Sequence, residues 1–501
     1  MRQPIPSESI PGRIHAWVAM TPDAVAVQES TRTLAYAQLW DHAGRVAENL
    51  LTHHDVHPGE TICVALEPSI DAITVMLGVL RAGAVIAAVD PRWPQPRRDL
   101  IRVELGVTVS VGTGGGDIRP QDLLSPPPRP HEQALPVVDA GSIATIFFTS
   151  GTSAAPKMVA SPHQALTRLI GPGRTLLTEP GHVMLHASRP GWDVHSLETW
   201  GTLSGGGTVH VLAGGVFPDS VISAVDAGVD HAWITSSLLN LLIDEDIDCL
   251  AGLRTIFTGG EKLSAPHVAK FLERHPHTTL INGYGPVESC VFATTHTVTS
   301  ADLDDIPIGR PVSGTTIALV TQGDVPADLL GGQPGDTGEI WLGGTGLATG
   351  YVNAPDSDDR FVTAGPEGQR WYRTGDQAWL APDGSYRFRG RLDRQVKIRG
   401  ARVQPEELEA QATSILGVSC RAEPVPGRWS GYDRLALFIG PGITTSPTEV
   451  RQALASALPK HLVPDVVVCV PTLPVTANGK VDSHTLLEAL ASSGEAQPCR
   501  S

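Results

Sequence analysis

Hydrophobic and polar positions follow two different periods along the first three hundred residues, which predicts alternating strands and helices. Short apolar runs rich in β-branched residues predict buried strands at 61–66, 84–89 and 143–148. Between the first two runs, residues 70–81 have apolar side chains at helical spacing and end at Gly83. Buried strands separated by such helices are typical of parallel βαβ units.

The same alternation extends on both sides of these units. Residues 11–53 have helical periodicity around a short strand-like segment at 34–36. Further on, the pattern predicts strands at 183–187, 209–211 and 255–258, a strand that opens into a glycine turn over 280–288, and helices at 192–203 and 236–243. The last two strands run into glycine turns, and open α/β sheets hold ligands at strand ends of this kind.

The pattern changes twice towards the C-terminus. Short strands with frequent turns over 308–386 predict a small β subdomain, and after Arg391 a new set of helices and strands begins, including a capping box at 446–449. We expect an α/β fold in which a large N-terminal domain (1–392) contains stacked parallel α/β subdomains plus this β subdomain. A small mobile α+β domain (393–490) and a disordered tail (491–501) follow, and a Gly- and Pro-rich loop or linker is expected at 112–136.

Composition narrows the possible functions. The 501 residues carry a formal net charge of −16, which argues against a general nucleic-acid or membrane-surface role because both need clustered cations. The six cysteines show no CxxC pairing, so we expect reduced thiols and no disulfide scaffold. No signal peptide and no apolar run of the ~18 residues needed to span a bilayer is present, which predicts a cytoplasmic protein.

The segment 147–158, Phe-Phe-Thr-Ser-Gly-Thr-Ser-Ala-Ala-Pro-Lys-Met, is the strongest local candidate for binding an anion. Its hydroxyls, backbone N–H groups and Lys157 suit phosphate oxygens, and Ser161-Pro162 predicts that a helix begins close to the loop with its positive end. The segment does not match the Walker pattern, and a satisfied turn without ligand is the alternative.

An ordered series of motifs resembles the adenylate-forming enzyme superfamily, and within it the amino-acid adenylation domains of nonribosomal peptide synthesis. The matches include Tyr372-Arg-Thr-Gly-Asp376, Gly390-Arg-Leu-Asp-Arg-Gln-Val-Lys-Ile-Arg-Gly400 and Asn478-Gly-Lys-Val-Asp482. The others lie at 34–39, 80–83, 149–157, 192–193, 282–288, 338–339, 350–351 and 458–464. Each motif alone is more often an ordinary turn or hairpin, but their order along nearly the whole chain favours the family.

The resemblance implies a two-step reaction that uses ATP and Mg²⁺. A carboxylate attacks the α-phosphate to give an acyl-adenylate and pyrophosphate, and a thiol then displaces AMP; the first step needs neutralisation of negative charge. By the resemblance, Glu288 is the metal ligand and Lys480 bridges substrate and nucleotide. Asp393 is the hinge of the small domain, and Lys397 faces the site in the second step. Nucleotide contacts are implied for Thr149, Ser150, Gly151, Thr152, Lys157, Gly259, Asn282, Gly283, Tyr284, Asp376, Phe388 and Arg391.

The resemblance also implies the acid that is activated. Asp193 matches the residue that holds the α-ammonium group of amino-acid substrates. By position along the motifs, the pocket is lined by Asp193, Val194, Leu197, Trp233, Phe257, Gly259, Gly283, Val291 and Phe292. Its wide aromatic side chains leave a short apolar cavity, so we expect valine, isoleucine or another small aliphatic acid.

Three positions depart from the family pattern. Ala154 and Met158 replace glycines in the loop, where a Cβ at positive φ costs about 1 kcal/mol or more. Val287 replaces a threonine whose hydroxyl would reach phosphate, a loss of ~1.5–3 kcal/mol unless Ser289 or water replaces it. A weakened or non-catalytic nucleotide-binding member is therefore an alternative, as is a ligase that forms acyl-CoA or amides.

Only 19 residues follow the last motif. We therefore expect a stand-alone enzyme that loads the phosphopantetheine thiol of a separate carrier protein in natural-product biosynthesis, such as that of an antibiotic. The need for a small MbtH-like activator is left open.

Overall fold

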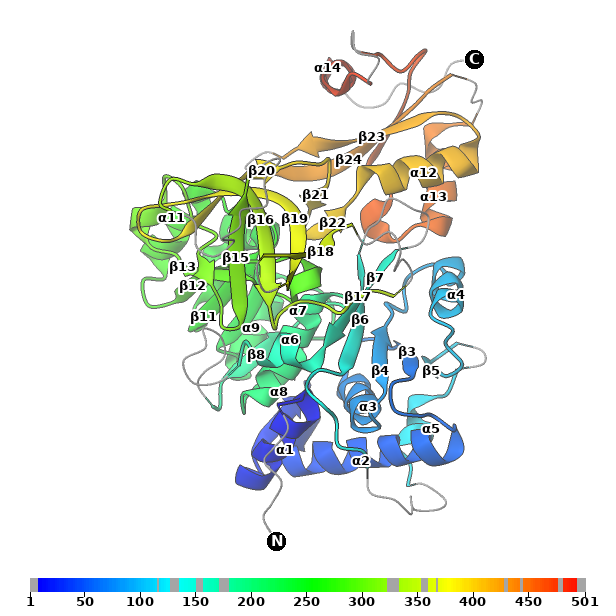
Figure 1. The fold of residues 1–501 in the computed structure, drawn as a ribbon, viewed down its shortest axis with the longest axis vertical. Coiled ribbons are helices and arrows are strands. Elements are labelled where there is room, and N and C mark those ends of the chain that lie inside the picture. Colours follow the sequence, from blue (N-terminus) through cyan, green and yellow to red (C-terminus); the bar gives the residue numbers. More distant parts are fainter. Residues whose placement is uncertain are drawn as a thin grey trace.

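The computed structural model describes residues 8–114, 117–126, 135–149, 156–170, 180–321, 333–352, 359–365, 368–427, 431–441, 445–475 and 481–492. A large body built from three sheets carries a smaller domain, coloured orange to red, at one end (Figure 1). None of the helices in these described ranges is long and apolar enough to cross a bilayer.

The largest sheet has nine strands in the order β14-β13-β12-β11-β10-β8-β9-β1-β2. Its middle strands, from β9 to β12, are parallel neighbours, as the βα alternation predicts. Their ends therefore share one edge. The strands are β1 (Val25–Gln28), β2 (Thr33–Ala35), β8 (Val183–His186), β9 (Thr208–Val211), β10 (His231–Thr235), β11 (Thr255–Gly259), β12 (Thr279–Tyr284), β13 (Thr294–Thr297) and β14 (Arg310–Pro311).

The second sheet has six strands in the order β17-β7-β6-β4-β3-β5. Its strands are β3 (Thr61–Ala65), β4 (Val85–Ala88), β5 (Ser110–Gly112), β6 (Ile143–Thr149), β7 (Lys157–Pro162) and β17 (Gly350–Tyr351). Helix α3 (Ile70–Arg81) connects β3 and β4 and begins at Ser69, whose Oγ accepts the Ala72 N–H at 3.1 Å. Its ten residues from Ile70 to Leu80 other than Asp71 are buried between neighbouring elements, which fixes this unit in the core.

The segment after the anion-loop candidate folds differently from the prediction. β7 runs back antiparallel to β6, with Thr149 opposite Lys157 and Pro162 opposite Ile143. Helix α6 (His163–Thr167) therefore begins at the far end of this hairpin, and Ser161 lies within β7 and does not cap it. The expectation of a helix N-terminus beside the loop is wrong because a strand separates the two.

The other helices of the large body cover these sheets. They are α1 (Ile10–Met20), α2 (Tyr36–His53), α4 (Gln95–Glu104), α5 (Pro120–Leu124), α7 (Asp193–Ser196), α8 (Thr202–Ser204), α9 (Pro218–Asp226), α10 (Ser236–Asp246) and α11 (Ala265–Arg274). Two results differ from the sequence patterns. The expected linker at 112–136 contains α5, and the single helix expected at 192–203 has a π-helical turn, Leu197–Gly201, between α7 and α8.

The predicted β subdomain is a five-stranded sheet in which β15 (Thr315–Val320), β16 (Thr337–Gly344), β19 (Gln369–Leu380) and β18 (Phe361–Ala364) follow one another. The fifth strand, β20 (Tyr386–Arg391), pairs with β19 and leads towards the small domain. The nucleotide-site candidates Asp376 and Arg391 lie opposite each other on these last two strands.

The small domain has its own sheet and apolar core. Its elements are β21 (Val396–Ile398), β22 (Ala401–Val403), α12 (Pro405–Leu416), β23 (Cys420–Pro426), β24 (Tyr432–Ile439), α13 (Pro447–Ala457), β25 (Val466–Cys469) and α14 (Ser483–Ser492). The predicted capping box is present: Ser446 and Glu449 exchange hydrogen bonds at the start of α13. Cys63, Cys249, Cys290 and Cys420 are free thiols, but Cys469 is disulfide-bonded, which corrects the expectation of reduced cysteines.

Candidate active site

Four of the sequence-predicted site residues lie at or just after the shared edge where β11 and β12 end. Gly259 is the last residue of β11, and Gly283 and Tyr284 end the neighbouring β12. Glu288 follows on a short 3₁₀ turn, Val287–Ser289. The strand order thus brings residues that are far apart in sequence to one side of the sheet.

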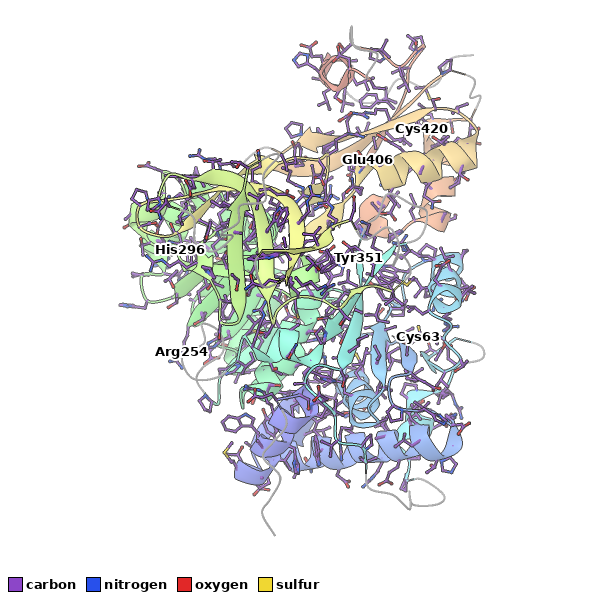
Figure 2. All side chains as sticks on the ribbon, viewed as in Figure 1. Cys63, Arg254, His296, Tyr351, Glu406 and Cys420 are labelled. Carbon is purple, nitrogen blue, oxygen red and sulfur yellow. The ribbon has the colours of Figure 1, made fainter. Side chains whose placement is uncertain are left out.

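Glu288 is completely buried and is surrounded by donors from two domains. Arg402 of β22 places its Nη1 3.1 Å from both carboxylate oxygens, and the Tyr351 hydroxyl donates to Oε1 at 2.7 Å. Burial alone would raise the pKa of Glu288, but Arg402 and Tyr351 lower it below its ordinary 4.5, so the carboxylate is ionised. Tyr351, labelled in Figure 2, lies where the small domain meets the large body.

A second acidic group, Asp376, lies beside the expected hinge. The Tyr284 hydroxyl donates to its Oδ2 at 2.6 Å, and the Arg391 guanidinium pairs with Oδ1. Arg391 also donates to Asp393 at 2.7 Å, while Arg360 holds the other oxygen of Asp393 at 2.9 Å. Burial opposes ionisation of Asp393, but these two guanidinium groups keep its pKa below the usual 3.8.

The β21–β22 hairpin of the small domain inserts its tip into this site. The Gly400 N–H donates to Glu261 of the large domain at 2.8 Å, and a Cβ at Gly400 would lie 2.7 Å from Cγ2 of Thr235. Lys397 is partly buried and interacts electrostatically with Asp193 and Asp376; desolvation lowers the pKa of its ammonium group, and the two carboxylates oppose this shift. Lys397 and Gly400 therefore face the site, the arrangement that the resemblance implies for the second step, whereas the Arg399 side chain is exposed and pairs with Asp465 of the small domain.

The described part of the anion loop contains its two ends. Thr149 is buried, and Lys157 lies with Nζ 4.8 Å from the ring centre of Tyr351. Burial, with help from nearby Arg402, lowers the pKa of Lys157. Met158 lies within β7 with its side chain in the core, so the expected penalty of a Cβ at positive φ does not apply to it. Ser150, Gly151, Thr152, Ala154 and Lys480 lie outside the described residues.

Two further nucleotide candidates lie at this edge in different settings. The Asn282 side-chain amide is buried and donates to the Pro307 carbonyl at 2.7 Å, so it fixes the neighbouring backbone. Phe388 lies on β20 and is 39% exposed.

The predicted substrate pocket begins at Asp193, the first residue of α7. Its Oδ1 accepts the Val194 N–H at 3.0 Å and its Oδ2 accepts the Val291 N–H at 2.9 Å. Only 9% of Asp193 is exposed, and burial raises its pKa above 3.8. One backbone donor to this carboxylate belongs to α7 itself and the other to the loop at Val291, and the positive charge of Lys397 partly offsets the rise in its pKa.

Aromatic side chains pack against one another behind Asp193. The ring centroid of Phe292 lies 5.4 Å from that of Trp233 and 6.5 Å from that of Phe257. A Cβ at Gly283 would lie 2.1 Å from Phe292, so this position has room only for glycine. Leu197 and Val194 are buried in the same cluster, which makes the predicted lining residues one contiguous apolar group.

The loop that presents Val291 is strained and is held by a residue that the sequence motifs missed. Cys290 and Val291 have φ values of 46° and 66°, which are unusual for residues with a Cβ, above all for a β-branched one. Nη2 of Arg168 donates to the Ser289 and Phe292 carbonyls at 2.7 and 2.8 Å, on either side of this strain. Arg168 lies more than a hundred positions upstream, so no local pattern indicates its role.

The donor set around Glu288 fits Mg²⁺ better than a metal that needs several protein ligands. Within the residues that the structure describes, no three His, Cys, Asp or Glu side chains are grouped as a metal centre. Mg²⁺ commonly uses one or two carboxylates together with substrate phosphates. A buried, ionised carboxylate at this edge of the sheet satisfies that need, and its charge is stable there only beside a cation.

Known proteins place the chain in a family. Residues 14–352 match the family of AMP-binding enzymes. The chain is 33% identical over 495 residues to a linear gramicidin synthase of Brevibacillus parabrevis, covering 93% of this chain and 9% of that protein. Gramicidin S synthase 2 of Aneurinibacillus migulanus is 30% identical over 503 residues, and there the match covers 11% of the relative. The chain thus spans about a tenth of the length of these curated relatives.

Solved structures that this chain covers over most of their length support the same family assignment. PA1221, an NRPS protein containing adenylation and PCP domains, is 32% identical with a TM-score of 0.84, covering 96% of this chain and 97% of that chain. Its holo form bound to a vinylsulfonamide inhibitor is 34% identical with a TM-score of 0.86, covering 96% and 84%. The chain belongs to the AMP-binding enzymes, and within them it is an adenylating ligase of the nonribosomal peptide synthetase type.

Proposed function

We propose that this adenylation domain activates a small aliphatic α-amino acid, valine- or isoleucine-like, as its aminoacyl-AMP. It then transfers the aminoacyl group to the phosphopantetheine thiol of a carrier protein supplied in trans. The observation that carries the proposal is Asp193, a buried carboxylate that accepts hydrogen bonds from two backbone N–H groups and whose partner residues Val194 and Val291 belong to the apolar cluster of the predicted lining residues. An α-ammonium group is the substrate feature that such a carboxylate pairs with.

The size of the substrate follows from the pocket's far wall. Trp233, Phe257 and Phe292 are at most 8% exposed and fill the space behind the pocket with their rings. A short branched side chain packs against such a wall, whereas an aromatic one would have to displace it. An apolar pocket discriminates one methylene by only ~1–3 kcal/mol, so neighbouring aliphatic acids will be accepted to some degree.

The remaining residues divide between the two steps. In the first step, Glu288 would hold Mg²⁺, which neutralises the phosphates, and Lys480 would contact both substrate carboxylate and nucleotide. Asp376 would bind the ribose hydroxyls and Lys157 the phosphate chain. In the second step, after rotation about Asp393, Lys397 would face the adenylate while the thiol attacks. The separate domain cores on either side of Asp393 support this boundary.

The first test is amino-acid-dependent ATP–pyrophosphate exchange with each proteinogenic amino acid, using Lys480→Ala as the control. Strong exchange with valine or isoleucine that disappears in the variant is the expected result. Loading of a phosphopantetheinylated carrier, compared with coenzyme A and simple amines as acceptors, then tests the second step.

Two results would contradict parts of the proposal. Exchange that is strongest with an aromatic or charged acid would refute the pocket assignment. Nucleotide binding without exchange by any acid would favour a weakened member, and restoring threonine at Val287 would show whether that position is responsible. Preferential transfer to coenzyme A or to an amine would refute the carrier step alone.

A further inference from the structure

We propose that Arg402 and Mg²⁺ are alternative partners of Glu288, so that binding of the metal and docking of the β21–β22 hairpin exclude each other. The inference rests on the proposed use of Mg²⁺ at Glu288 and adds to it a role for a residue of the small domain. In this role Arg402 is a positioning residue, because it acts through Glu288 and through the place of the hairpin.

The geometry leaves one cation position at Glu288. A single nitrogen, Nη1 of Arg402, lies 3.1 Å from both carboxylate oxygens, and the Tyr351 hydroxyl occupies a further side of Oε1. Mg²⁺ binds carboxylate oxygen at about 2.0–2.1 Å with strict octahedral geometry. A guanidinium group centred between both oxygens blocks that approach, and the two positive charges would repel each other.

The two partners of Glu288 belong to different arrangements of the protein. Arg402 reaches Glu288 only because the hairpin tip is docked, where the Gly400 N–H contacts Glu261 and Gly400 packs against Thr235. A metal at Glu288 therefore requires that the hairpin move away. Conversely, a docked hairpin lowers the affinity for metal by the same factor, because such coupling is reciprocal.

Because the carboxylate of Glu288 is fully buried, it needs Arg402 as a partner when Mg²⁺ is absent. Glu288 has 0% exposure, and a buried charge that loses its partner costs several kcal/mol. When pyrophosphate leaves together with Mg²⁺, Glu288 would remain without a cation. Arg402 supplies one from the domain whose arrival brings Lys397 and Gly400 to the site. Loss of the metal thereby favours the arrangement that the second step uses.

The test measures amide hydrogen exchange over residues 396–403 and the magnesium concentration at half-saturation. The nucleotide is α,β-methylene-ATP, whose α–β bridge resists cleavage. In the wild type, nucleotide with EDTA should leave the Gly400 amide protected, and added Mg²⁺ should release it. Arg402→Ala should show release without metal. If docking holds about 90% of wild-type molecules, its magnesium midpoint should be about tenfold lower.

Arg399→Ala is the matched control on the same hairpin, since Arg399 is 61% exposed and pairs with Asp465 of its own domain. It should respond to magnesium as the wild type does. Equal midpoints for wild type and Arg402→Ala, or an unchanged Gly400 amide with metal and nucleotide bound, would overturn the proposal. If Arg402→Ala does not fold, the wild-type response to magnesium alone decides.

Failure of this competition can be distinguished from failure of the proposed substrate. Magnesium-dependent release of the hairpin in a protein that exchanges pyrophosphate with no amino acid would refute the substrate and leave the competition standing. Amino-acid-dependent pyrophosphate exchange, with no effect of Arg402→Ala on the magnesium midpoint or on the Gly400 amide, would refute the competition and leave the proposed substrate standing. Failure to bind the nucleotide at all would overturn both.

Discussion

The predicted substrate pocket and the predicted nucleotide-binding edge, which includes Glu288, use the same strands of the large sheet. Different kinds of contact hold the side chains of these two regions in place. The pocket behind Asp193 is built from one body, with apolar rings in contact and a carboxylate held by backbone groups. The nucleotide edge consists of ionised groups whose partners come from two domains, as in Glu288–Arg402 and Glu261–Gly400. Under the proposed function, substrate choice would therefore depend on one packed core, whereas the chemistry would depend on contacts between the two domains.

The largest expected effect comes from comparing two buried glutamates, Glu288 and Glu198. Glu288→Gln should reduce ATP–pyrophosphate exchange by about 10²- to 10³-fold, a barrier higher by about 2.7–4 kcal/mol, because it removes the negative charge that would hold Mg²⁺ in the first step. The rate of exchange at saturating substrates is the measurement.

Glu198→Gln is the matched control for that variant. Glu198 is equally buried, but burial raises its pKa to about 8, so its carboxyl group is mostly neutral at pH 7. An amide can replace the neutral acid that bonds with Ser188 and two backbone N–H groups. Comparable losses in both variants would mean that charge is not what distinguishes the two sites.

Asp193→Asn should lower kcat/KM for the amino acid by about 10²-fold and leave nucleotide binding unchanged. The amide keeps an acceptor for Val291 but no charge for an ammonium group, a loss of ~2–5 kcal/mol. Steady-state kinetics together with calorimetric titration of ATP would separate the two effects. A variant that loses ATP binding as strongly as amino-acid binding would contradict the independence of the pocket.

The pH dependence of kcat/KM in the wild type and in Asp193→Asn is a second test of the role of Asp193. Burial raises the pKa of Asp193, and binding of an ammonium group needs the ionised form. Wild-type kcat/KM should therefore fall as the pH is lowered through a range above 3.8, the ordinary aspartate value. The Asn variant should lack this limb of the profile; a shared limb would assign it to another group.

Trp233→Ala should change the choice of substrate and leave the nucleotide edge intact. Removing the ring opens space beside Phe292, so the ratio of kcat/KM for phenylalanine to that for valine should rise by about 10- to 100-fold. The measurement is competitive exchange with both acids. An unchanged ratio would show that Trp233 supports the fold without lining the pocket.

Arg97→Ala should have the smallest effect, and on the second step alone. Arg97 of α4 forms a buried ion pair at 3.4 Å with Glu407 of α12, which joins the two domains away from the site. Glu407 becomes hydrated when the domains separate, so its charge is not left buried without a partner. The variant therefore shifts only the equilibrium between docked and separated domains, by about tenfold or less. Carrier loading should slow relative to pyrophosphate exchange, and Arg98→Ala, the next residue, should not share the effect.

The sequence predicted those parts of the fold that local patterns determine. Residues 70–81 form the predicted helix because their apolar positions have helical spacing and both ends have suitable residues. β7 was missed because its Lys, Ser and Pro resemble a loop, although pairing with β6 makes them a strand. Strand β10 and its helices α9 and α11 were also not recognised, since their short apolar runs lack a distinct period.

The motifs located the candidate site residues, but not the partners that hold them. Arg402 and Glu288 are 114 positions apart, and Gly400 and Glu261 are 139 apart, so their contacts depend on how one domain docks on the other. The same is true of Arg360 at Asp393. The hairpin Val396–Val403 carries three cationic side chains in its sequence, but only the fold identifies Arg402 as the one that meets Glu288.

Arg168 limits how the pocket can be re-engineered. A chimaera that moves the pocket segment of this chain onto a relative's scaffold would carry the strained turn at 290–291 and leave behind the guanidinium that ties down both of its flanks. The transferred segment therefore has to begin upstream of Arg168, or the recipient has to accept an arginine at the equivalent position. Libraries that vary only the lining residues keep this tether and so start from an intact turn.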